Sequence, residues 1–203
     1  MEEQTNNLIN STRDIYNKNK NIYNKVLLSI GLLLSDNYDK ESYISLINSI
    51  FNINESKNKN LNIDFTSNYN NKFVNKSIFS SNINKLEYLY FFNKFTIKSN
   101  NFDIQGYINR LVNYIDCEEI NFYYSFLLIC RLINNYEIKF FNNKNVYLIF
   151  FIALVISIKT NEDKTFSNKD YATIGCIPLK LFAKLENIFL ELIDYNIIFS
   201  TIC

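Results

Sequence analysis

The sequence predicts an all-α fold in which one helix is buried at the centre of the others. Glycine occurs 3 times and proline once in 203 residues, too rarely for the many tight turns of a β-sandwich or barrel. Apolar residues recur at helical spacing along much of the chain. Residues 146–158 carry no charge at all, and a helix without a polar face has to be surrounded by its neighbours.

Two helices are expected near the N-terminus, followed by a polar stretch. Residues 24–36 (NKVLLSIGLLLSD) are apolar on all sides and predict one buried helix. Residues 52–84 are polar and rich in asparagine, which predicts a loop or an insertion. The aromatic pattern of residues 83–95 fits either a helix or an extended segment. Residues 40–51 predict the second helix through a one-sided apolar stripe of Tyr43, Ile44, Ile47, Ile50 and Phe51.

The C-terminal half predicts five helices. The first (DIQGYINRLVNYI) is entered at a capping Asp103, and the second (EEINFYYSFLLICRLINN) begins with two acidic residues, which complement the helix dipole. The third contains the uncharged segment and spans about residues 144–160. A short fourth helix (SNKDYATIG) has Ser167 and Asn168 as candidate caps and Gly175 as its terminator.

The fifth helix begins near Pro178, a residue that suits a first helical turn. Its apolar stripe consists of Phe182, Leu185, Phe189, Leu192 and Ile193.

Composition and charge exclude several function classes. The net charge is +1 without a cluster of Lys and Arg, so we expect no nucleic-acid partner and no anionic membrane surface. The 13 uncharged residues fall short of the roughly 20 that span a bilayer. Histidine is absent, which removes the commonest general base and zinc ligand. We therefore expect no catalytic residue, no metal, no cofactor and no small-molecule ligand.

The cysteines indicate a reducing compartment. Cys117, Cys130, Cys176 and Cys203 show no C-x-x-C spacing, and we interpret them as reduced thiols. The acidic, polar start MEEQTNN is not a signal peptide. We expect a cytoplasmic or nuclear protein, or one found in both places.

Two charged residues flank apolar surface. Lys159 ends the uncharged segment, and Glu186 lies on the same side of its helix as Phe182 and Phe189. Each has an ordinary interpretation: a lysine at a helix C-terminus complements the dipole by about 0.3–1 kcal/mol, and a flanking acid pairs with a nearby cation. Together at the rim of one apolar patch they would instead indicate a docking site for another protein.

The order and spacing of residues 151–200 resemble the second half of a cyclin box. The resemblance is closest to the P-type cyclins, the group around the fungal phosphate-response cyclin. Upstream, residues 102–133 match the family's first two helices, so the resemblance covers about half of the chain. The matching residues are Lys159, Asp163, Asn168, Tyr171, Ala172, Gly175, Leu185, Glu186, Phe189, Leu190 and Asp194.

The resemblance implies a five-helix cyclin box and a regulatory function. A cyclin binds a cyclin-dependent protein kinase at its αC helix and switches it on, without performing chemistry itself; a cell-cycle role is a further expectation from the family. The resemblance assigns kinase binding to Lys159 and Glu186, with Phe182, Leu185 and Phe189 around them. The alternative is a cyclin-fold scaffold or adaptor that binds a kinase or another protein without activating it.

Some residues depart from the family pattern. Cys130 precedes Arg131 where cyclins usually have Asp, and Asn101 lies about where that Asp would find its arginine partner. Loss of both members of a buried ion pair can be nearly neutral, so the fold prediction stands. The first helix also lacks the substrate-docking MRAIL pattern.

The domain organisation follows from these assignments. Residues 1–51 are expected to form an N-terminal helical extension, 52–100 an Asn-rich insertion and lead-in segment, and 101–201 the cyclin box.

Overall fold

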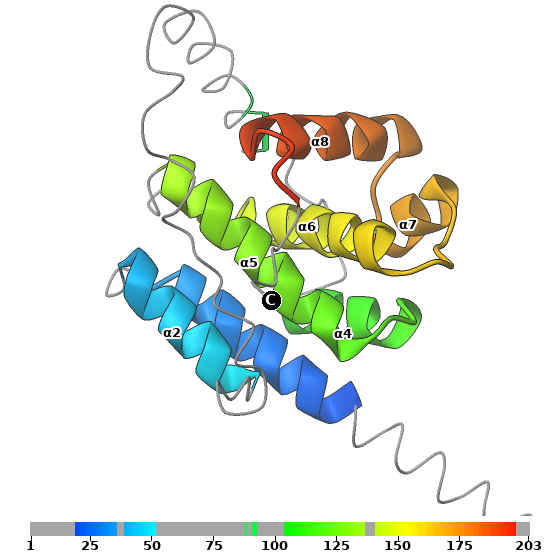
Figure 1. Cartoon of the computed structure of the whole chain (residues 1–203). Helices are drawn as coiled ribbons and strands as arrows, with labels where there is room; N and C mark the ends of the chain where they lie inside the picture. Colours follow the sequence, from blue (N-terminus) through cyan, green and yellow to red (C-terminus); the bar gives the residue numbers. More distant parts are fainter. Residues whose placement is uncertain are drawn as a thin grey trace, which may run out of the picture.

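The structure, a computed structural model, describes residues 19–35, 39–51, 88, 91–92, 104–136 and 141–197, without the side chains of Lys40 and Asn134. Within these ranges every regular element is a helix, as predicted. The polar stretch 52–84 and the predicted cap Asp103 lie outside them. A helix over residues 19–33 is followed by α2 (Lys40–Ile50), α4 (Ile104–Tyr114), α5 (Glu119–Asn135), α6 (Val146–Asn161), α7 (Asn168–Ile174) and α8 (Leu179–Leu192) (Figure 1).

Helix α6 lies at the centre of the fold, as its uncharged sequence predicted. Every residue from Val146 to Ile158 is buried except Tyr147, which is half-buried. Helices α4, α5 and α8 all contact α6, and Figure 1 shows α6 between α5 and α8. Burying one large apolar side chain stabilises a fold by about 1.5–3 kcal/mol, so this helix contributes a large share of the core.

Aromatic rings hold the neighbouring helices against α6. Phe126 of α5 stacks on Phe150 with ring centroids 5.1 Å apart. On the other side, Phe182 of α8 lies 6.0 Å from Phe151. The two consecutive phenylalanines of α6 therefore contact two different helices.

The N-terminal helices belong to the same core as the five C-terminal ones. Tyr43 of α2 is fully buried, and Phe51, which follows α2, lies 5.9 Å from the ring of Tyr123 in α5. The Tyr123 hydroxyl donates to Asn48 Oδ1 at 2.8 Å. Figure 1 shows α2 and the 19–33 helix on the far side of α5 from α8. The described part of the predicted extension, residues 19–35 and 39–51, thus covers a face of α5.

Arg131, which follows Cys130 where cyclins usually have Asp, has a backbone partner. Its guanidinium donates to the carbonyl of Asn196, beyond the end of α8. The Asn135 amide donates to the Leu192 carbonyl at 3.1 Å. The last carbonyls of a helix have no partner within it, so α5 caps the C-terminal end of α8. Cys130 is fully buried, and Asn101 lies outside the described residues.

The turn around α7 follows its sequence signals. Ser167 is the N-cap: its hydroxyl accepts from the Asp170 N–H, while the Asp170 carboxylate accepts from the Ser167 N–H. Gly175 is the C-cap, as predicted, but its φ of −73° is open to any residue. A Cβ at Gly175 would lie 2.4 Å from a ring carbon of Phe151, so close approach to the central helix is the reason for glycine there.

We expect Gly175→Ala to lower the free energy of unfolding by about 1–3 kcal/mol, because the added methyl group overpacks the core against Phe151. Gly31→Ala is the matched control. A Cβ at Gly31 meets nothing within 4 Å, so the same change inside a helix should be neutral or stabilise by up to about 1 kcal/mol. Urea unfolding followed by circular dichroism measures both; equal stability of the two variants would contradict the packing explanation.

Candidate protein-interaction site

Lys159 lies where the central helix leaves the core. It occupies the last turn of α6, directly after the buried Ile158, and its side chain is 27% exposed. Its Nζ donates to Glu186 Oε1 of α8 at 2.5 Å and to Asn168 Oδ1 of α7 at 2.7 Å. The ammonium group of Lys159 thus links α6 to both α7 and α8.

Aromatic rings form an apolar floor beneath this ammonium group. Lys159 Nζ lies 5.3 Å from the ring centroid of Phe182 and 6.0 Å from that of Tyr171. These two rings are stacked, with centroids 6.3 Å apart. A cation over an aromatic face is stabilised by about 0.5–2 kcal/mol, more where water is excluded. The aromatic contacts and the ion pair therefore act together to fix the position of the Lys159 side chain.

The ion pair is partly buried and retains hydrogen-bonding capacity. Glu186 has a side chain only 15% exposed, because it lies among the apolar residues of α8. An ammonium group has three hydrogens, of which Glu186 and Asn168 take two, and a carboxylate has a second oxygen. One donor of Lys159 and one acceptor of Glu186 are thus left for a partner.

The structure brings two of the five predicted site residues together and places the others behind them. Lys159 and Glu186 are in direct contact. Phe182, Leu185 and Phe189 are fully buried in the core, and of these three the Phe182 ring lies beside Lys159. The assignment of all five to kinase binding stays a prediction. Sequence reasoning did not select Asn168 as a site residue, although it is the first residue of the short α7 that Ser167 caps.

Tyr171 is the titratable group most affected by this environment. Burial raises the pKa of the Tyr171 hydroxyl to about 12, and the nearby backbone N–H of Phe166 opposes that shift. The hydroxyl approaches this N–H without completing a hydrogen bond. Tyr171 is therefore neutral at physiological pH and acts as an aromatic support.

A second polar network fixes the end of α6 against the start of α5. The Glu162 carboxylate accepts from Asn121 Nδ2 at 2.5 Å and from the Glu118 N–H at 3.0 Å. Asn121, which is fully buried, accepts from Ser157 Oγ at 3.2 Å and from Asn161 Nδ2 at 3.1 Å. These bonds satisfy the polar groups of the last turns of α6, so Lys159 projects from a rigid helix end.

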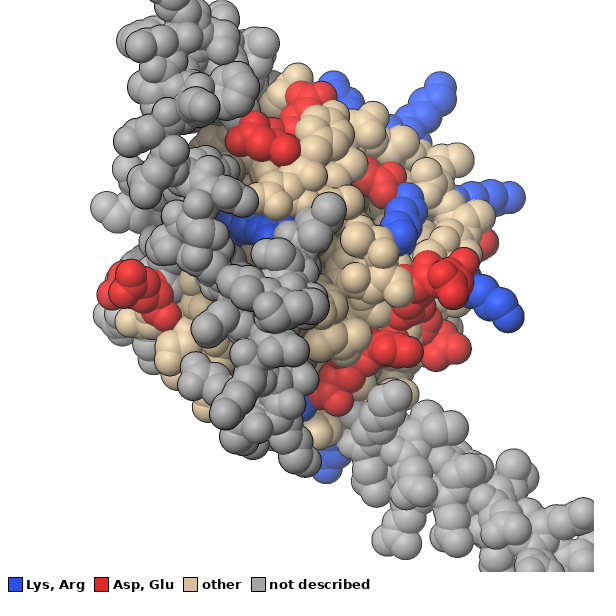
Figure 2. Space-filling model, viewed as in Figure 1, with Lys and Arg blue, Asp and Glu red and all other residues tan. Residues whose placement is uncertain are grey.

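Some of the acidic side chains form a band on one part of the surface (Figure 2). Figure 2 shows them on the side where α4 and the α6–α7 loop lie in Figure 1, with basic side chains interspersed. Among the exposed acids, Asp116 and Glu118 lie between α4 and α5, and Asp163 lies between α6 and α7. Among the described residues, no group of three His, Cys, Asp or Glu side chains could hold a metal ion.

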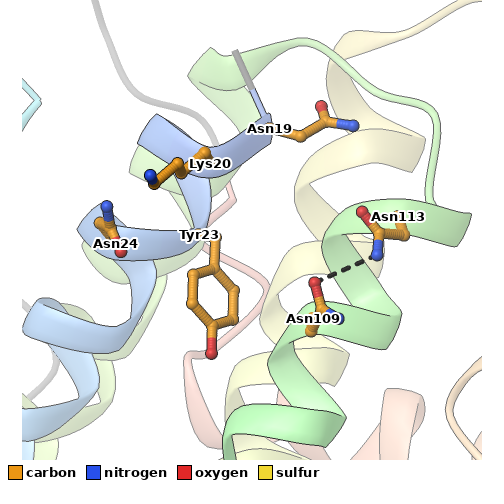
Figure 3. Close-up of a pocket in the computed structure, with 6 residues that line it drawn as sticks. All are labelled: Asn19, Lys20, Tyr23, Asn24, Asn109 and Asn113. Atoms are coloured by element: carbon orange, nitrogen blue, oxygen red, sulfur yellow. Dashed lines mark hydrogen bonds between the residues drawn. The ribbon is translucent and has the colours of Figure 1, made fainter. Parts of the chain in front are cut away.

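A polar pocket of about 490 Å³ lies between the 19–33 helix and α4 (Figure 3). Figure 3 shows Tyr23 pointing into the space between the two helices, and Asn113 donates to Asn109 Oδ1 at 3.1 Å. Amides offer hydrogen bonds but neither a nucleophile nor a metal-ligand set. The pocket is formed by helices other than those of the Lys159 site, and its lining consists of Asn19, Lys20, Tyr23, Asn24, Asn109 and Asn113.

Three comparisons with known proteins bear on this site. A family model described as Cyclin matches residues 40–197, a range that includes α2 and the segment 52–100. The chain is also similar to Cyclin-U4-2 of Arabidopsis thaliana, with 27% identity over 100 residues. That alignment covers 48% of this chain and 46% of the plant protein, so the chain spans about half the length of the curated relative it matches. No solved structure gave a significant match.

The residues described by the structure include no helix that is both long and apolar enough to cross a bilayer.

We expect Lys159→Met to lower the free energy of unfolding by about 1–2 kcal/mol, because the Glu186 carboxylate would stay partly buried without its cation. Adding Glu186→Leu should recover part of this loss, since replacing a whole buried pair costs less than removing one member. Urea unfolding of both single variants and the double variant completes a double-mutant cycle. Additive effects in the cycle would show that the two side chains do not stabilise each other.

Proposed function

Because the chain belongs to the cyclin family, we propose that it is a regulatory subunit that binds and activates a cyclin-dependent serine/threonine protein kinase, without catalytic activity of its own. The P-type character and the cytoplasmic or nuclear location expected from the sequence are part of this proposal. The observation that supports it best is the Lys159–Glu186 pair, in which charged groups with unused hydrogen-bonding capacity lie at the edge of the central helix.

The pair suits recognition of main-chain groups on a kinase. The remaining hydrogen of Lys159 can bind a backbone carbonyl, and the second oxygen of Glu186 can accept from a backbone N–H. Directional bonds of this kind fix the register of two proteins within an otherwise apolar contact. The proposed target is the segment beside the αC helix of the kinase.

Binding there would activate the kinase through a two-state element. An active protein kinase needs an ion pair between a glutamate of αC and the lysine that holds ATP phosphates. A partner that binds only the inward position of αC shifts the population toward it, by an amount set by its differential affinity for the two states. In this mechanism the rigid helix end at Lys159 supplies the fixed surface on which αC is held.

The alternative is a cyclin-fold scaffold that binds a kinase without activating it. It is favoured by one departure from the family pattern: Arg131 follows Cys130 rather than an acid and donates to the Asn196 carbonyl. If the chain is an activator, adding it to its purified kinase should raise phosphorylation of a peptide substrate severalfold or more. Binding with an unchanged rate would support the scaffold.

We expect the charge swap Lys159→Glu with Glu186→Lys to abolish kinase binding while leaving the melting temperature close to that of the wild type. The swapped side chains can still pair with each other, but they present a donor where the kinase offers a donor and an acceptor where it offers an acceptor. Each cyclin-dependent kinase of the source organism, purified singly, is tested by pull-down.

The matched control is a swap of the second ion pair, Lys25→Glu with Glu119→Lys, which joins the 19–33 helix to α5. This control should bind the kinase as the wild type does. Wild-type binding by the Lys159/Glu186 swap would show that this pair is not the docking element.

A further inference from the structure

Phe166 exposes an aromatic ring beside the Lys159–Glu186 pair. The residue is 39% exposed, whereas phenylalanine is among the residue types most often fully buried. The ring lies 5.7 Å from that of Tyr171, in an edge-to-face arrangement, and the Tyr171 ring lies 6.0 Å from Lys159 Nζ. The exposed ring is thus one aromatic contact away from the ammonium group.

The capped start of α7 explains why this ring has a fixed position. Phe166 directly precedes the N-cap Ser167, and Tyr171 is the fourth residue of the helix. An apolar contact between these two positions is a hydrophobic staple, which sets the angle at which the chain enters a helix. The capping bonds between Ser167 and Asp170 hold the same turn. Phe166 is therefore ordered before any partner binds.

The surroundings of Phe166 have the composition of a binding-interface centre. Charged, exposed side chains lie on both sides of it in the sequence: Asp163 and Lys164 before it, Lys169 after it. Interfaces commonly have a polar rim around buried aromatic anchors, and an anchor that is already rigid loses little entropy on binding. An aromatic ring held in this way adds binding affinity. The hydrogen bonds of the neighbouring charged groups fix the relative position of the two proteins.

We infer that Phe166 is an aromatic anchor that inserts into an apolar depression on the partner kinase, next to the main-chain groups that Lys159 and Glu186 bind. This inference rests on the proposed function and adds to it the chemistry of the partner surface: an apolar depression bordered by backbone carbonyl and N–H groups. The staple alone would account for the contact with Tyr171, but it leaves the outer face of the ring in water.

The test compares Phe166→Ala with Ser167→Ala, by isothermal titration calorimetry against the kinase that the wild type binds. Both changes weaken the start of α7, but only the first removes the ring. We expect Phe166→Ala to raise the Kd by about tenfold or more and Ser167→Ala by less than about threefold. Leu28→Ala, which truncates an exposed apolar side chain on the 19–33 helix, should bind as the wild type does.

The outcomes separate this inference from the proposed function. Circular dichroism melts confirm first that each variant is folded. If the wild type binds, the Lys159/Glu186 swap does not, and Phe166→Ala binds as tightly as wild type, the function stands and the anchor is wrong. Equal losses of affinity for Phe166→Ala and Ser167→Ala would show that Phe166 acts only as the hydrophobic staple of α7. A wild-type chain that binds none of the kinases would overturn both proposals.

Discussion

The burial of α6 is the constraint on which the other helices depend. Its uncharged residues leave no side that can face water, so at least three helices have to pack around it. The ring of Phe150 contacts α5, and the ring of Phe151 contacts α8. Phe151 also limits the size of the side chain at position 175. The short helix α7 is positioned by the same contact, because Gly175 ends it against Phe151.

The candidate site lies at the point where the buried helix α6 ends. At Lys159 the backbone passes from the buried part of the helix to the surface within a single turn. A long side chain can keep its stem on apolar neighbours while its ammonium group reaches polar ones, and here these are Glu186 and Asn168. The polar network of Glu162 and Asn121 then makes the helix end rigid. The geometry of the site therefore follows from the way in which α6 leaves the core.

Patterns within single helices were readable from the sequence, and contacts between helices were not. The uncharged run located α6, and cap chemistry located Ser167 and Gly175, because both signals lie in consecutive residues. Family resemblance assigned Lys159 and Glu186 to one binding face, but their direct contact was not predicted, since residues 27 positions apart carry no local signal of contact. The close approach of Gly175 to Phe151 was missed for the same reason. Position on an apolar stripe also could not show that Phe182, Leu185 and Phe189 are completely inaccessible to water.

The attachment of the N-terminal helices to α5 has a consequence for folding order. The Lys25–Glu119 pair joins residues 94 positions apart, and Tyr123 reaches Asn48 across 75 positions, whereas α5 and α6 are consecutive elements. Contacts between distant parts of a chain form more slowly, because more entropy is lost in closing the intervening stretch. We expect α4 to α8 to assemble first, with the outer face of α5 exposed until the N-terminal helices arrive. A fragment that begins at residue 104 would keep that face, with Tyr123 and Phe126, permanently open to self-association.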